Sequence, residues 1–103
     1  MLDLAWRQPH FSSMTAKVEI YTKFACPYCV RAKHLLDGKG VDYAEHDITM
    51  GGERRDEMLE RAPGARTVPQ IFIDGIAIGG SDELRELEYD GKLDTLLTGN
   101  SAG

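Results

Sequence analysis

The spacing of hydrophobic residues changes from a strand period to a helix period near the start of the chain. Residues 17–23 (KVEIYTK) alternate apolar and polar side chains and are rich in β-branched and aromatic types, which predicts a strand. Residues 27–37 then carry apolar side chains at helical spacing. Pro27 suits the first helical position, and Gly38 is expected to stop the helix. The pattern therefore predicts a strand followed by a helix.

The rest of the chain continues this alternation and adds a hairpin. An Asp-Gly pair between two apolar triplets is the strongest short-range hairpin signal that a sequence offers, and Asp74-Gly75 is such a pair. The remaining predicted elements are a strand at 41–48, a helix at 53–62, strands at 71–73 and 76–78, a helix at 83–89 and a short terminal helix at 92–97.

This order of elements, β-α-β-α-β-β-α, predicts an α/β fold in which helices flank both faces of a four-stranded mixed sheet. The first β-α-β unit is expected to be parallel and the hairpin to add an antiparallel edge. A chain of 103 residues has room for one domain. We expect this domain to span 17–97, with a flexible extension at 1–16 and a disordered tail at 98–103.

Net charge and hydropathy argue against two classes of binding partner, nucleic acids and membranes. The net charge of −5 argues against binding to nucleic acid. No apolar run approaches the roughly 18 residues of a membrane span, and no secretory signal pattern opens the chain. A cytoplasmic protein that binds neither nucleic acid nor membrane is therefore expected. Residues 1–41 hold six Lys or Arg against three acids, so a small anion would be drawn to a site built from that segment.

The candidate chemistry lies in two cysteines, Cys26 and Cys29, spaced C-x-x-C at the predicted helix start. A structural disulfide here would close too small a loop to constrain the unfolded chain much. A zinc site would need four ligands, which the three histidines do not supply at suitable spacing. Helix N-termini favour thiolates, so Cys26 is predicted to be the nucleophile, with Lys23 as a nearby cation. Cys29 falls on the core-facing stripe of the helix and is predicted to be the buried, protonated, resolving thiol.

Three motifs at their mutual spacings resemble those of one family. They are Tyr21-Thr22-Lys23-x-x-Cys26-Pro27-Tyr28-Cys29, Thr67-Val68-Pro69 and Gly79-Gly80-Ser81-Asp82-Glu83. Over about residues 16–97 the chain resembles the dithiol glutaredoxins, especially the short bacterial type with a C-P-Y-C active site. The resemblance implies a thioredoxin-like fold. It also implies a glutathione-dependent thiol–disulfide oxidoreductase with Cys26 and Cys29 as the catalytic residues.

The resemblance further implies a binding groove for glutathione, which acts as a co-substrate. In relatives the peptide bond of Pro69 is cis, and the backbone of Val68 pairs with the cysteinyl part of glutathione. Lys23 and Tyr28 lie near its glycyl end, and its γ-glutamyl carboxylate meets backbone N–H groups at residues 80–82, as anions do at helix N-termini. The implied glutathione-binding residues are Lys23, Tyr28, Thr67, Val68, Pro69, Gly80, Ser81 and Asp82, and no metal ligand is implied.

Smaller expectations concern polar residues on the helices. Arg61 and Arg66 are further candidates for holding a carboxylate. Ser81 is expected to be the N-cap of its helix. Glu57 and Arg61 are expected to pair at i, i+4 with little effect on stability.

The partners implied are glutathione and proteins that carry a disulfide or a glutathionylated cysteine. Ribonucleotide reductase is a possibility only at the level of the family, and the protein is expected to be a monomer. One alternative of a different class is an iron–sulfur scaffold, in which two protomers hold a cluster through Cys26 and two glutathiones; the presence of Pro27-Tyr28 and Cys29 weighs against it. The other alternative is a partner-binding module without catalysis.

Overall fold

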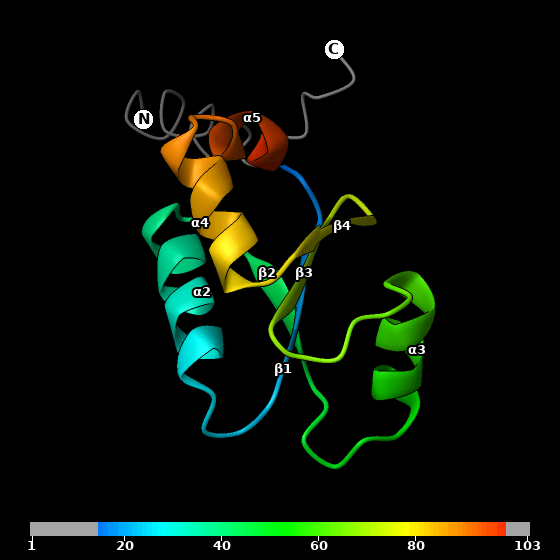
Figure 1. Ribbon diagram of the computed structural model, residues 1–103. Helices are drawn as coiled ribbons and strands as arrows, with labels where there is room; N and C mark the ends of the chain where they lie inside the picture. The colour runs from blue at the N-terminus through cyan, green and yellow to red at the C-terminus, as the bar shows by residue number, and fades with distance from the viewer. Residues whose placement is uncertain (1–14, 99–103) are drawn as a thin grey trace, which may run out of the picture.

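A four-stranded mixed sheet flanked by helices organises the computed structural model, which describes residues 15–98 (Figure 1). The expected fold class is therefore confirmed. The elements are β1 (Val18–Thr22), α2 (Pro27–Gly38), β2 (Tyr43–Asp47), α3 (Glu53–Arg61), β3 (Gln70–Ile73), β4 (Ile76–Gly79), α4 (Ser81–Tyr89) and α5 (Leu93–Leu97).

The strand order is β2-β1-β3-β4, with β1 buried along its whole length. β1 pairs in parallel with β2, as the β-α-β prediction required, and antiparallel with β3. The predicted hairpin joins β3 to β4. Asp74 and Gly75 both have positive φ, at 52° and 81°, which is the geometry that Asp-Gly hairpin turns adopt.

The face of the sheet that α2 and α4 cover carries the larger hydrophobic cluster. Its buried residues come from alternate positions of β1 and β3, from α2, α4 and α5, and from the loop before β2: Val18, Ile20, Ala32, Leu36, Val41, Ile71, Ile73, Leu84, Leu93 and Leu97. We call this side the α2/α4 face. In Figure 1, α2 and α4 lie beside each other on one side of the sheet and α3 lies on the other.

The opposite side, the α3 face, has a smaller buried cluster of Tyr21, Ile48, Met58 and Phe72. A polar network adjoins it. Arg61 of α3 donates to Glu19 and, at 2.7 Å, to the Tyr21 hydroxyl, which itself donates to Glu57. Arg61 therefore pairs with β1, and the expected Glu57–Arg61 pair is wrong. Glu57 instead pairs with Arg54 at 3.0 Å.

Two helix ends differ from expectation. Gly38 is the last residue of α2, and the chain turns away at Gly40, whose φ is 73°. Gly40 can adopt this left-handed conformation without a steric penalty, so it acts as the stop that was expected at Gly38. Gly80, and not Ser81, is the N-cap of α4, because the Glu83 carboxylate accepts from the Gly80 N–H at 2.8 Å.

The expected domain limits fall close to the ends of the described segment. Thr15 and Ala16, assigned above to the extension, bond to the end of α5: the Thr15 hydroxyl donates to Thr98 O at 2.9 Å and Ala16 N to Leu97 O at 3.0 Å. The rest of the expected extension and tail, 1–14 and 99–103, lies outside the described residues. Within 15–98, no helix has the length and hydropathy needed to cross a membrane.

Candidate active site

Cys26 occupies the N-cap of α2, at the end of the loop that leaves β1. Its backbone is extended, with φ −111° and ψ 106°, and its sulfur accepts a hydrogen bond from the backbone N–H of Cys29 at 3.2 Å. Ala25 before it has φ 57°, a conformation that residues with a Cβ adopt rarely and that clusters at functional sites. The loop thus aims a sulfur at the helix N-terminus, where negative charge is stabilised.

Cys29 lies in the first turn of α2 and has a very different environment. Only 2% of its surface is exposed, and it shares the buried stripe of the helix with Ala32 and Leu36, as expected. Burial, together with the hydrogen bond to Cys26, raises the pKa of Cys29 to about 12. Both cysteines are free. The pair therefore consists of one accessible sulfur and one buried thiol that stays protonated at neutral pH.

A groove of about 350 Å³ opens beside Cys26. The first turn of α2, the loop before β3 and the start of α4 form its walls, and its lining residues are Tyr28, Thr67, Val68, Pro69, Gly80, Ser81, Asp82 and Glu83. Seven of these eight are residues that the resemblance implied. The Val68–Pro69 peptide bond is cis, as expected. The Cys26 sulfur lies 3.8 Å from the Val68 carbonyl oxygen, which joins the nucleophile to the groove.

The close approach of β4, α4 and the Pro69 loop explains the Gly79-Gly80 pair. A Cβ on Gly79 would lie 2.9 Å from the Glu83 side chain, and one on Gly80 would lie 3.3 Å from the Pro69 carbonyl oxygen. Small residues here let the start of α4 reach the groove. The first N–H groups of a helix lack partners within the helix, so this end can bind an anion. Asp82 adds a carboxylate, 3.3 Å from Arg85.

Sequence reasoning missed Glu83, which lines the groove but also caps α4 through its bond to Gly80. The signal that identifies it is a Glu at the third helical position, from which a capping-box side chain bonds back to the N-cap N–H. The expected site residue Lys23 is exposed at the end of β1 and is not among the lining residues. Arg61 is held on the α3 face by Glu19 and Tyr21, so it is wrong as a carboxylate ligand here. Arg66 is exposed and does not line the groove.

Comparison with known proteins decides the family. A family model described as glutaredoxin matches residues 18–78. Over 82 residues the chain is 55% identical to Glutaredoxin 3 of Escherichia coli strain K12. This match covers 80% of this chain and 98% of that protein. It is 49% identical to a probable glutaredoxin of Synechocystis over 85 residues, 82% of this chain and 97% of the relative. The chain belongs to the glutaredoxin family.

Solved glutaredoxin structures agree with the fold. The solution structure of glutaredoxin from Brucella melitensis has a TM-score of 0.70 and 50% identity, covering 85% of this chain and 95% of that one. The crystal structure of a buckwheat glutaredoxin–glutathione complex has a TM-score of 0.73 and 32% identity, covering 95% and 91%. This glutaredoxin is accordingly a short bacterial-type member of the family and a thiol–disulfide oxidoreductase.

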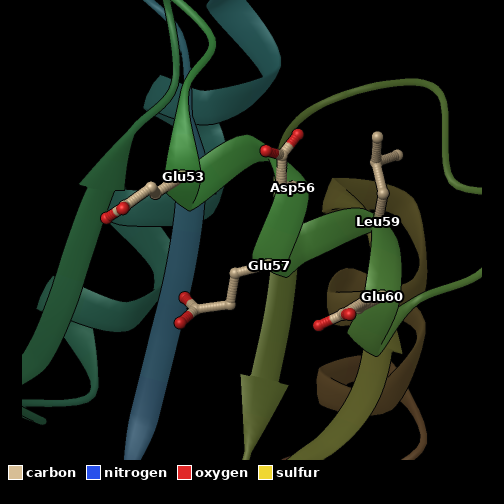
Figure 2. A pocket seen from close by; sticks show the side chains of 5 residues that line it. All are labelled: Glu53, Asp56, Glu57, Leu59 and Glu60. Carbon is tan, nitrogen blue, oxygen red and sulfur yellow. The ribbon is translucent and has the colours of Figure 1, made fainter.

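A second hollow of this glutaredoxin, about 480 Å³ in volume, lies along α3. Figure 2 shows its lining: the carboxylates of Glu53, Asp56, Glu57 and Glu60, with Leu59 among them. These acids repel an anion and adjoin neither cysteine. Within residues 15–98, no group of three or more His, Cys, Asp or Glu side chains is arranged to hold a metal ion. Of these two hollows, the groove is the one that has a cysteine sulfur beside it.

Proposed function

We propose that this glutaredoxin uses glutathione to reduce protein–glutathione mixed disulfides and protein disulfides, with Cys26 as the nucleophile. The observation that carries the proposal is the groove beside Cys26, which places a helix N-terminus and an exposed loop backbone within reach of one accessible sulfur. Such a groove suits a small peptide with carboxylates at its ends. The buckwheat relative, solved as a complex with glutathione, supports this choice of ligand.

The first step exchanges one disulfide for another. The Cys26 thiolate attacks the glutathione sulfur of a protein–S–S–glutathione bond; the protein leaves as a thiolate and takes a proton from solvent, and Cys26 becomes glutathionylated. A second glutathione thiolate then attacks that bond. Oxidised glutathione leaves and the Cys26 thiolate is restored. The N–H of Cys29, which donates to the Cys26 sulfur, stabilises this leaving thiolate.

Protein disulfides follow a second route that uses both cysteines. Cys26 attacks one sulfur and releases the other as a thiolate. Cys29 then attacks the Cys26 sulfur of the mixed disulfide, its proton passes to the departing substrate sulfur, and the reduced protein is released. The resulting Cys26–Cys29 disulfide is reduced by two glutathiones. Because Cys29 is buried and protonated, it reacts slowly until the mixed disulfide has formed beside it.

The lining residues other than Glu83, which caps α4, are proposed to hold glutathione. The Val68 backbone pairs with the cysteinyl part of glutathione, between Thr67 and the Pro69 ring. At the start of α4 the N–H groups of Ser81 and Asp82 bind the γ-glutamyl carboxylate, while the Gly80 N–H stays bonded to Glu83. Asp82 accepts from the ammonium group of glutathione. Tyr28 borders the groove at the glycyl end. Lys23, at the exposed end of β1, is proposed to attract the glycyl carboxylate over a longer range.

Partners and compartment follow from this chemistry. Glutaredoxin potentials of about −200 to −230 mV lie near the glutathione poise of the cytosol, which favours a cytoplasmic protein. Proteins with accessible disulfides, among them the family-level candidate ribonucleotide reductase, are the proposed substrates of a monomer. The iron–sulfur scaffold stays an alternative prediction, which an absorbance spectrum of anaerobically purified protein tests.

A pair of serine substitutions tests the division of labour. Cys26→Ser is expected to abolish turnover of the mixed disulfide of glutathione and β-mercaptoethanol, because no nucleophile remains. Cys29→Ser is expected to keep substantial activity on this substrate and to lose activity on protein disulfides. Comparable loss in both variants on the small substrate would contradict the assignment.

A charge-removing pair tests the groove. Asp82→Asn is expected to raise KM for the same mixed disulfide by about tenfold, because it removes a charge-assisted hydrogen bond to the ammonium group. Asp90→Asn, at the other end of α4, removes the same charge outside the groove lining and serves as the control. An equal effect of both variants would mean that net charge, and not contact in the groove, governs binding.

A further inference from the structure

Large hydrophobic side chains that remain exposed are unevenly distributed over the described part of the chain. Those of residues 15–98 are Phe24, Tyr28, Val30, Met50, Ile76 and Tyr89. The first four come from the β1–α2 loop, the first turns of α2 and the β2–α3 loop. In Figure 1 these two loops lie at the same, lower end of the sheet. Clusters of this kind on a soluble protein mark interaction sites, whereas single exposed apolar residues need no explanation.

Three of these residues lie outside the groove lining, in the β1–α2 loop, the start of α2 and the β2–α3 loop, and we call them the apolar rim: Phe24, Val30 and Met50. Phe24 precedes Cys26 by two residues and is 82% exposed. Val30 lies one helical turn after Cys26, since its N–H donates to the Cys26 carbonyl oxygen at 3.1 Å. Met50 is 94% exposed. None of the three lines the groove.

Hydrogen bonds hold the two loops of the rim together. The Phe24 N–H donates to the Thr49 hydroxyl at 2.7 Å, which links the β1–α2 loop to the residue before Met50. Thr49 N donates in turn to the Asp47 carboxylate at 2.8 Å, and Gly51 N donates to Ile48 O at 2.9 Å. The backbone on both sides of Met50 is therefore fixed although its side chain faces solvent. The backbone of the rim is therefore preorganised, so that no loop has to become ordered before a partner binds.

From this arrangement we propose that the apolar rim binds the polypeptide of a protein substrate and selects cysteines that have apolar neighbours in their own chain. This inference rests on the proposed function. Glutathione is small and polar and occupies the groove on one side of Cys26, so it has no use for the rim. A protein disulfide that reaches Cys26 must bring its flanking residues over the surrounding surface. Met50, which is flexible and polarisable, suits partners of many shapes.

The experiment compares two matched glutathionylated peptides, one with leucines and one with serines on both sides of its cysteine. Wild-type protein is expected to reduce the leucine peptide with a kcat/KM about fivefold higher than the serine peptide, from partial burial of apolar side chains. Phe24→Ser/Met50→Ser is expected to reduce both peptides equally well. It should retain wild-type kcat/KM on the mixed disulfide of glutathione and β-mercaptoethanol. Ile76→Ser/Tyr89→Ser removes two exposed apolar residues elsewhere and should keep the fivefold preference.

Three other results would contradict the rim proposal or the proposed function. If the wild-type protein reduces the small disulfide but the rim variant keeps the preference for the leucine peptide, the rim does not bind substrate. If wild-type protein does not reduce the small disulfide, the proposed function is wrong and the rim proposal falls with it. If sedimentation shows a wild-type dimer that the rim variant alone dissociates, the rim binds a second copy of this chain instead.

Discussion

The two faces of the sheet are joined to their helices by different kinds of interaction. On the α2/α4 face, ten buried apolar residues form one cluster. On the α3 face, four of the residues within 15–98 do so, and Arg61 connects α3 to β1 through Glu19 and Tyr21. Cys26 and residues 80–82 belong to helices of the first face. The two helical walls of the groove are thus held by apolar packing on the first face. The third wall is the loop before β3, where Val68 packs against the smaller cluster, and α3 itself contributes no residue to the lining.

The two kinds of interaction contribute differently to the free energy of unfolding. Apolar burial stabilises in proportion to area and leaves no group unsatisfied. A partly buried ion pair contributes less net stability, because desolvation offsets much of the attraction, but it fixes one geometry. We therefore expect the α2/α4 face to supply most of the stability and the polar network to set where α3 lies. Substitutions on the two faces separate these contributions.

The largest expected effect is that of Leu84→Ala. Leu84 is fully buried in α4, three residues after the groove residue Ser81. Removing its side chain leaves a cavity in the larger cluster and should lower the free energy of unfolding by about 2 to 5 kcal/mol in urea titrations. Leu59→Ala on α3 is the matched control. Leu59 is half-buried, so a loss of about 1 kcal/mol is expected. Equal losses would mean that the faces do not differ.

Arg61→Met comes next. It keeps a long apolar stem over Phe72 but leaves the nearly buried Glu19 carboxylate without the cation and the Tyr21 hydroxyl without a donor. Unfolding free energy should fall by about 1 to 3 kcal/mol at pH 7. In the double variant Glu19→Gln/Arg61→Met the loss should be clearly smaller than the sum of the two single losses. Additive losses would show that the two side chains act independently.

Acid should weaken the α3 face through Glu19. Burial alone would raise the pKa of Glu19, but the hydrogen bond and charge of Arg61, with help from Lys17, outweigh it and hold the pKa below its usual 4.5. A carboxyl with a lowered pKa in the folded state contributes stability that is complete above about pH 4.5 and is lost as the pH falls through the lowered value. Unfolding free energy should therefore decline below about pH 4.5, and less steeply in Arg61→Met. Equal slopes would remove Glu19 as the cause.

The elements and the cysteine chemistry could be predicted from the sequence because their signals are local. Alternating residues 17–23 and Asp74-Gly75 define β1 and the hairpin, and the C-x-x-C spacing places Cys29 on the buried stripe of α2. The groove residues lie in motifs that are far apart in the sequence. Only the resemblance to a known family predicted that these motifs form one site.

What could not be predicted depends on contacts between distant segments. Arg61 has a local partner in Glu57, but α3 lies over β1, where Glu19 offers a less exposed carboxylate, so the tertiary contact prevails. Likewise Gly38 and Gly40 both fit a helix stop by residue type. Only the path of the chain from α2 toward β2 selects Gly40 for positive φ.

The smallest effects are expected from two exposed ion pairs, one on each face of the sheet. Arg54 of α3 and Arg85 of α4 each pair with an acid three residues away along the helix, at 3.0 and 3.3 Å, and both arginines are more than half exposed. Solvent screens such pairs, so Arg54→Ala and Arg85→Ala should leave the urea midpoint unchanged within error. If Arg54→Ala instead cost as much as Arg61→Met, the whole charge network would hold α3. The contrast between the faces would then no longer depend on the one buried partner, Glu19.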